Sequence, residues 1–298
     1  MIVNLKFSES KSDLFSSFCL ERFHNFKFYK FLNTVEKMTN FGVNSKNMKF
    51  YRPIFFTLPL IFSLCCFGQT KEPTYSNIRY SKEYERSVLD LWLAESNKLT
   101  PLVINFHGGG FRIGDKRFFN RSPMLKKYLK EGVSFASVNY PFVQQVDGNY
   151  STILEHTTES VHFLIKSAKK FNIDPNRISV MGNSAGALIT CYLGHAKKLG
   201  IKSIFPIQQP KGTPLLIPFF RKDGPAVMVY NRSGKNDPIH HPDFAVMVKE
   251  RCKELGVECH AYGVQGTGLD QLPRDKNFHD LAMNFFRKSW KVNKRKKK

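Results

Sequence analysis

The most constraining feature of the chain is the run Gly-Asn-Ser-Ala-Gly at residues 182–186, which lies between a strand-like and a helix-like stretch. The apolar residues 178–181 precede it, and residues 187–193 continue it with a helical pattern. Glycines on both sides of Ser184 are needed because a side chain there would collide with the neighbouring strand or helix. Such a turn holds a serine in a strained conformation above a parallel sheet, so strands alternating with helices are expected.

A second glycine-rich run, His-Gly-Gly-Gly-Phe at residues 107–111, follows the apolar stretch 102–106, which predicts a buried strand. A loop of this kind can turn backbone N–H groups toward the negative oxygen of an acyl-transfer transition state. The two runs together predict acyl transfer from a serine nucleophile. We expect the His107 side chain to support the shape of the loop rather than to act as a base.

With these two motifs, roughly residues 75–290 resemble the α/β-hydrolase superfamily, and within it small esterases and lipases. Bacterial acetyl esterases and feruloyl or xylan esterases are similar in pattern. The resemblance implies Ser184 as the nucleophile. It also implies that the N–H groups of Ala185 and of Gly109 or Gly110 form the oxyanion hole. The alternative is that Gly182 and Gly186 serve close packing alone.

The remaining apolar runs predict the architecture. Strands are expected at residues 88–93, 102–106, 134–140, 177–181, 203–207, 226–230 and 257–262, with helices at 153–171, 242–255 and 276–290. This alternation predicts an α/β fold with a doubly wound, mostly parallel sheet flanked by helices, and a site at the carboxyl ends of the strands. We expect residues 88–93 to be an edge strand. Residues 208–223 are the only room for a minimal cap, either as a lid or as a surface loop.

Asp237 is the candidate acid of the site. It follows the predicted strand 226–230 in a glycine-containing loop and precedes Pro238. In the family that the chain resembles, this pattern carries the acid that orients the catalytic histidine, and the order serine, acid, histidine is the expected one. The alternative is an Asp-Pro turn that caps the helix beginning near Pro242.

The catalytic histidine is missing from its usual place. Relatives end their last strand with Gly-His-Gly, whereas this chain has Gly-Thr-Gly at residues 266–268. Thr267 cannot act as a base near neutral pH. We expect His279 to replace it, because a helix that follows a parallel strand begins near the edge of the sheet where the serine lies.

Other histidines are alternatives to His279. His240 and His241 follow the acid directly, and His260 lies on the last predicted strand. The remaining alternative is a fold that retains the nucleophile without an efficient base. Such a chain would be a slow enzyme or a binding protein that uses the old active-site cleft.

The net charge and the cysteine content limit which partners and disulfide bonds are expected. The net charge is +22, and residues 291–298 form a basic tail that we expect to be disordered. No nucleic-acid module is recognisable, so weak contact with an anionic membrane surface or an acidic polysaccharide is the expected role of the tail. Cys191, Cys252 and Cys259 are expected to be free thiols, with a bridge between the last two as the alternative. No metal or organic cofactor is expected.

The first part of the chain predicts export. Residues 48–68 read as a secretory signal peptide, with a short basic region before an apolar run too short to span a bilayer comfortably. Residues 1–47 are interpreted as an upstream extension or a mis-assigned start, and residues 69–290 as the hydrolase domain. The sequence thus predicts a secreted or periplasmic serine carboxylesterase that acts on short-chain acyl esters, including acyl groups on carbohydrate.

Overall fold

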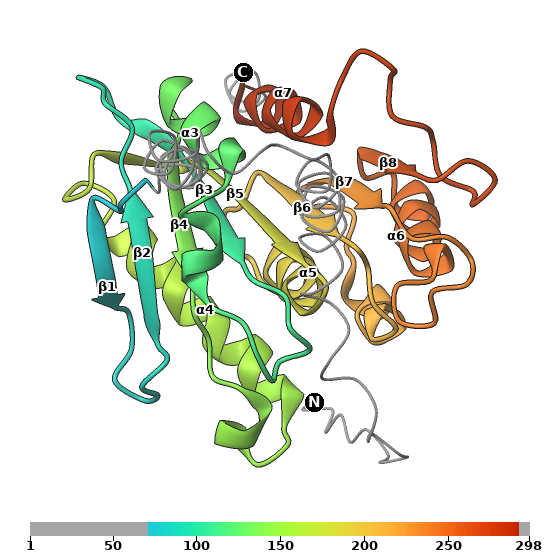
Figure 1. Cartoon of the computed structure of the whole chain (residues 1–298), viewed down its shortest axis with the longest axis horizontal. Helices are drawn as coiled ribbons and strands as arrows, with labels where there is room; N and C mark the ends of the chain where they lie inside the picture. Colours follow the sequence, from blue (N-terminus) through green and yellow to red (C-terminus); the bar gives the residue numbers. More distant parts are fainter. Residues whose placement is uncertain (1–70, 292–298) are drawn as a thin grey trace, which may run out of the picture. The chain divides into compact units, whose positions relative to one another are not determined.

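A computed structural model describes residues 71–291, and the predictions for residues 1–47, 48–68 and 292–298 lie outside this part. Its centre is an eight-stranded sheet of order β1-β2-β4-β3-β5-β6-β7-β8 (Figure 1). The strands are β1 (Tyr75–Arg79), β2 (Val88–Trp92), β3 (Thr100–Phe106), β4 (Ser134–Val138), β5 (Ile173–Asn183), β6 (Ser203–Ile207), β7 (Ala226–Asn231) and β8 (Cys259–Gly263).

Only β2 runs against the other strands. β1 pairs antiparallel with β2, β2 pairs antiparallel with β4, and all remaining neighbours are parallel. The doubly wound, mostly parallel sheet is therefore confirmed. The prediction that residues 88–93 form an edge strand is wrong, because β1 pairs along the outer side of β2 and is itself the edge strand.

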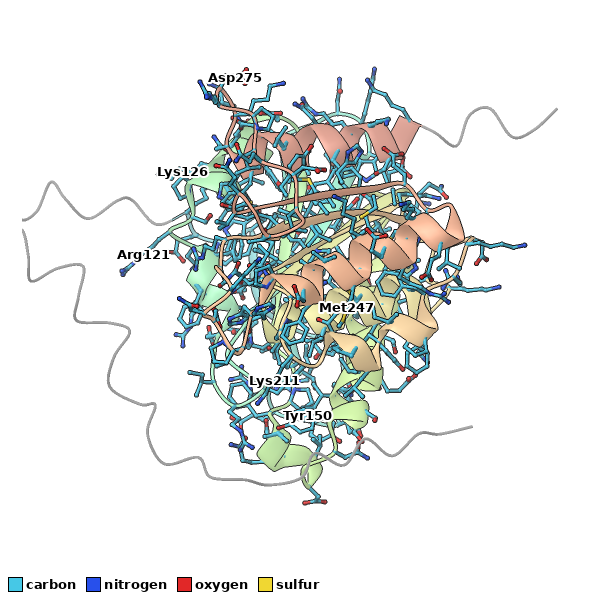
Figure 2. The ribbon with its side chains drawn as sticks, turned by 90° about the vertical axis from the view of Figure 1, so that its right-hand side faces the viewer. Arg121, Lys126, Tyr150, Lys211, Met247 and Asp275 are labelled. Atoms are coloured by element: carbon cyan, nitrogen blue, oxygen red, sulfur yellow. The ribbon has the colours of Figure 1, made fainter. Side chains whose placement is uncertain are left out.

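Helices cover both faces of the sheet, and the alternation of side chains along the strands explains why. The helices are α3 (Pro123–Lys130), α4 (Tyr150–Lys166), α5 (Ala185–Cys191), α6 (Pro242–Leu255) and α7 (Phe278–Lys291). On β3, Leu102 and Ile104 face the core shared with α4, α5 and α6, whereas Val103 faces the core shared with α3 and α7. None of these helices is long and apolar enough to cross a membrane. Figure 2 shows the side formed by α6 and α7, with Met247 on the outer surface of α6.

The connection between β6 and β7 is short and lies against α6 and the π-helical turn Tyr192–Ala196 that follows α5. It contains two 3₁₀ turns, Thr213–Leu215 and Ile217–Phe219. The Phe220 ring stacks on His195 with centroids 4.0 Å apart, and Arg221 Nη1 donates to the His195 carbonyl at 2.6 Å. This half of the connection therefore covers the π-helical turn, beyond the end of α5 that is remote from Ser184. Only its first residues, near Gln208 and Lys211, reach the loop that carries Asp237.

A buried ion pair ties the loop after β3 to the sheet. Lys116 Nζ lies 2.8 Å from Asp90 Oδ1, and both side chains are almost fully buried. The Lys116 N–H also donates to Asn139 Oδ1 at 2.7 Å, just beyond β4. Because a charge buried without its partner is costly, this pair holds the far end of the glycine-rich loop in one position.

Candidate active site

Ser184 occupies the sharp turn between β5 and α5 that the sequence predicts. Its backbone angles are φ 55° and ψ −114°, a conformation that non-glycine residues rarely adopt. A Cβ atom on Gly182 would lie 2.3 Å from the Gly186 carbonyl oxygen, and one on Gly186 would lie 2.1 Å from the Phe106 carbonyl oxygen. Both glycines are thus required for the close approach of β5, α5 and β3.

The glycine-rich loop lies directly beside this turn. A Cβ atom on Gly108 would be 3.4 Å from the Ser184 Cβ, and Gly109 and Gly110 have φ values of 114° and 61°. Within residues 71–291, no backbone hydrogen bond uses the N–H groups of Gly109, Gly110 or Ala185. These three donors, which the sequence predicts as an oxyanion hole, thus lie in the segments that flank Ser184 with their hydrogen-bonding capacity unused.

The His107 side chain supports the shape of this loop. Its ring stacks on Tyr140 with centroids 4.4 Å apart, its Nδ1 lies 2.7 Å from the Gly108 carbonyl oxygen, and its Nε2 lies 3.4 Å from Arg86 Nη2. Arginine only donates, so Nε2 is the acceptor and Nδ1 carries the proton. Burial is the main cause that lowers the pKa of His107 to about 4, although the Gly108 carbonyl opposes the shift. The ring is therefore neutral near pH 7 and is already engaged within the loop.

His240 is the histidine that faces Ser184. Its Nε2 atom lies 2.9 Å from Ser184 Oγ, and its Nδ1 atom lies 3.4 Å from Asp237 Oδ2. One imidazole thus spans the serine and the carboxylate, with a different ring nitrogen toward each. This is the arrangement by which a histidine takes a proton from a serine while an acid holds its orientation.

Asp237 is held by four groups of its own loop. Ser233 Oγ donates to Oδ2 at 2.7 Å, and the N–H groups of Ile239 and His240 each donate to Oδ1 at 2.9 Å. Burial by itself would raise the pKa of this carboxyl. The Ser233 hydroxyl, the two N–H groups and the charge of His240 outweigh it and lower the pKa to about 2. Asp237 is therefore a carboxylate throughout the neutral range.

The structure does not bring His279 to Ser184. His279 lies at the start of α7, where its ring contacts Phe278 and where burial, with Lys127 close by, lowers its pKa. His260 on β8 pairs with Glu258, and His241 Nδ1 accepts from the Asp243 N–H at the start of α6. The assignment of His279 as partner of the serine is corrected to His240, which the sequence offered only as an alternative.

The usual position of the histidine has a different role here. Thr267 is buried, and its hydroxyl donates to the Val264 carbonyl at 2.5 Å, which closes the turn after β8. The acid and the histidine instead share one loop, three residues apart, with the expected order serine, acid, histidine retained. Proximity of His240 to Asp237 was the only sequence signal for this arrangement.

Two contacts place the loop that carries this pair. The buried Asn231, at the end of β7, donates its side-chain amide to the His240 carbonyl at 3.0 Å. The Lys211 N–H donates to the Ile239 carbonyl at 2.8 Å. Sequence inspection did not identify these contacts, because neither residue belongs to a motif of the family that the chain resembles.

The side chains that could together bind a metal ion lie away from Ser184. Among residues 71–291, Glu83, His156 and Glu159 are the side chains grouped closely enough to converge on a metal ion, and none of them belongs to this site. Cys191, Cys252 and Cys259 are free thiols, as expected. The site consists of serine, histidine, carboxylate and backbone N–H groups.

The strand order and the turn at Ser184 are those of the α/β-hydrolase fold. A family model, BD-FAE, matches residues 89–205, which run from β2 to the middle of β6. An isoprenylcysteine alpha-carbonyl methylesterase of Arabidopsis thaliana is 28% identical over 163 residues, or 50% of this chain and 37% of that protein. Gut esterase 1 of Caenorhabditis elegans is 30% identical over 96 residues, or 29% of this chain and 17% of that protein. The chain thus spans well under half the length of these relatives.

Solved structures agree on the fold. A truncated carbohydrate esterase from gut microbiota superimposes with a TM-score of 0.61 at 15% identity, covering 74% of this chain and 97% of that one. Esterase 2 of Thermogutta terrifontis has a TM-score of 0.58 at 15% identity, covering 73% of this chain and 96% of that one. At this level of identity the likeness establishes the architecture and not the substrate.

Replacing His240 by alanine should abolish the reactivity of Ser184, whereas replacing His279 should not. Removing a member of a serine triad lowers turnover by up to about 10⁶-fold, so we expect labelling of His240→Ala by a fluorophosphonate to slow by at least about 10³-fold. His241→Ala is the matched control beside it. Loss of labelling in His279→Ala with retention in His240→Ala would contradict the assignment.

His107 should make the protein less stable in mild acid. Its pKa is about 4 in the folded chain, below the ordinary 6.5, so between these values the unfolded chain binds more protons. The free energy of unfolding should therefore fall as the pH drops from 6.5 toward 4. In His107→Gln this fall should be smaller by about 2 kcal/mol. Urea unfolding at pH 6.5 and 4.5 measures it, and an unchanged fall in the variant would refute the prediction.

Proposed function

We propose that the protein is a serine carboxylesterase that hydrolyses short-chain acyl esters, with Ser184, His240 and Asp237 as its catalytic triad. The observation that carries the proposal is the continuous contact from Ser184 Oγ to His240 and on to Asp237, beside unused N–H donors. Homologues and structural neighbours that are named as esterases support it.

The reaction follows from this geometry. Ser184 Oγ attacks the ester carbonyl carbon while His240 Nε2 accepts the hydroxyl proton. The negative oxygen of the tetrahedral intermediate is stabilised by the N–H groups of Ala185 and of Gly109 or Gly110. His240 then returns the proton to the leaving alcohol, and an acyl-enzyme remains. A water molecule activated by His240 releases the carboxylic acid and restores Ser184.

Asp237 contributes through charge and orientation. It remains ionised at neutral pH and faces Nδ1, so it stabilises the imidazolium that forms in each transition state. It also keeps Nε2 directed at the serine. The carboxylate itself does not exchange a proton during the cycle.

A short acyl group on a bulky alcohol is the substrate class that we infer. The β6–β7 connection is short and lies against α6 and the turn Tyr192–Ala196 after α5, which supports an open site and a small cap. Two solved neighbours are named as a carbohydrate esterase and an acetyl ester-xyloside bifunctional hydrolase. These observations support acyl groups on carbohydrate as natural substrates.

Hydrolysis of p-nitrophenyl acetate by residues 69–298 tests the proposal. We expect sustained turnover that Ser184→Ala abolishes, falling as the acyl chain lengthens to butyrate and decanoate. Thr267→Ala is the control and should retain activity within about threefold, because Thr267 only closes a turn. A single burst without turnover would mean that Ser184 is acylated but lacks a base for deacylation, and equal background rates for the wild-type protein and Ser184→Ala would favour a binding protein instead.

We further infer that the protein is secreted or periplasmic and that its basic tail touches anionic surfaces. The signal-like residues 48–68 and the six positive groups in residues 291–298 support this. When the chain from Met48 is expressed in a bacterial host, mass spectrometry should find Gln69 as the new N-terminus in the exported fraction. An uncut chain confined to the cytoplasm would contradict export.

A further inference from the structure

Gln208 has a strained backbone and a nearly buried side chain beside the loop that carries Asp237. Its φ is 53°, a left-handed value that favours glycine or asparagine, and only 6% of the residue is exposed. Ser184 and Phe111 are two other non-glycine residues near the site with positive φ. Strain of this kind persists where the surrounding structure holds it in place.

The orientation of the Gln208 amide follows from its partners. Its Oε1 accepts from the Arg232 N–H at 2.6 Å, and a backbone N–H can only donate. The Nε2 group therefore faces Ser233, whose Oγ lies 2.9 Å away. The orientation is settled because exchanging the two amide atoms would place a donor against a donor.

This orientation determines where the Ser233 proton goes. A hydroxyl has one proton, and the amide group of Gln208 can only donate to it. Ser233 must then direct its proton to its other partner, Asp237 Oδ2, at 2.7 Å. His240, which contacts the same carboxylate oxygen at 3.4 Å, is the titratable group that faces Asp237.

We propose that Gln208 is a positioning residue that, through the Ser233 hydroxyl, keeps the Asp237 carboxylate directed at His240. The inference rests on the proposed function, in which this carboxylate orients the catalytic base. This role of Gln208 explains how Asp237 and His240, which lie on one short loop, stay aligned with each other. The contact from Nδ1 to Oδ2 is long, so a carboxylate free to rotate would release the imidazole.

Two substitutions at Gln208 separate positioning from packing. Gln208→Glu keeps an acceptor for the Arg232 N–H but presents a second carboxylate to Ser233, which then competes with Asp237 for one proton. Gln208→Met keeps the size of the side chain but loses both amide contacts, so that nothing then directs the Ser233 proton to Asp237. Positioning therefore lowers kcat moderately in Gln208→Met and more in Gln208→Glu, where the added carboxylate draws the proton away, whereas a purely structural role leaves the kcat of folded Gln208→Met unchanged.

We expect Gln208→Glu to lower kcat for p-nitrophenyl acetate by about tenfold or more at unchanged KM, and Gln208→Met by about threefold. Ser233→Ala should resemble Gln208→Glu, and Ser233→Thr, which keeps the hydroxyl, should restore most of the activity. Thermal unfolding of each variant checks that the fold is retained. A kcat equal to that of the wild-type protein in either Gln208 variant, or a larger loss in Gln208→Met than in Gln208→Glu, would overturn the proposal.

A readout without substrate separates this inference from the proposed function. In protein with ¹³C-labelled aspartate carboxyl groups, NMR should show Asp237 titrating at clearly higher pH in Gln208→Glu and Ser233→Ala than in the wild-type protein. The assignment comes from the signal that Asp237→Asn removes. If no ester is hydrolysed but this shift appears, the esterase proposal fails and the positioning role stands. If hydrolysis is normal and no shift appears, the positioning role fails alone.

Discussion

The site depends on one backbone turn at which β5 passes into α5 within contact distance of β3. At Gly186 even a methyl group would lie 2.1 Å from the Phe106 carbonyl oxygen, so the three segments approach as closely as peptide groups allow. The Ser184 N–H donates to the Ile207 carbonyl at 2.9 Å, which ties the turn to the end of β6 as well. Ser184 thus lies where the ends of three parallel strands meet, and the other functional groups are placed relative to it.

The loops around the turn are held by buried polar contacts rather than by regular secondary structure. Tyr140 donates its hydroxyl to the His107 carbonyl at 2.7 Å, and Arg86 Nη2 donates to the Gly114 carbonyl at 2.9 Å. The Lys116–Asp90 pair continues this support under the same loop. Because buried donors and charges are costly to leave unpaired, each contact restricts the glycine-rich segment to the shape that keeps its N–H groups free.

Because Asp237 and His240 lie on one loop, that loop must be anchored firmly enough to position both side chains. When the two groups come from separate loops, each is anchored by its own strand. Here the ends of β6 and β7 anchor both, through Gln208 and Asn231, and Lys211 adds a backbone contact. The loop after β8 contributes no residue to the proposed triad, and Thr267 uses its hydroxyl to close a local turn.

Local residue patterns predict the parallel sheet, Ser184, the glycine-rich loop and Asp237, because each depends on residues that are adjacent in the chain. Apolar runs between glycine-rich turns are local signals of this kind. Which histidine contacts Ser184 depends instead on the tertiary structure. The contact from Ser184 to His240 joins residues 56 positions apart and depends on the path of a loop held by Gln208 and Asn231. The sequence-based topology favours His279, because its helix begins near the expected edge of the sheet. Only the folded path of the chain distinguishes the two, because topology specifies the edge at which a segment begins but not the direction in which its side chain points.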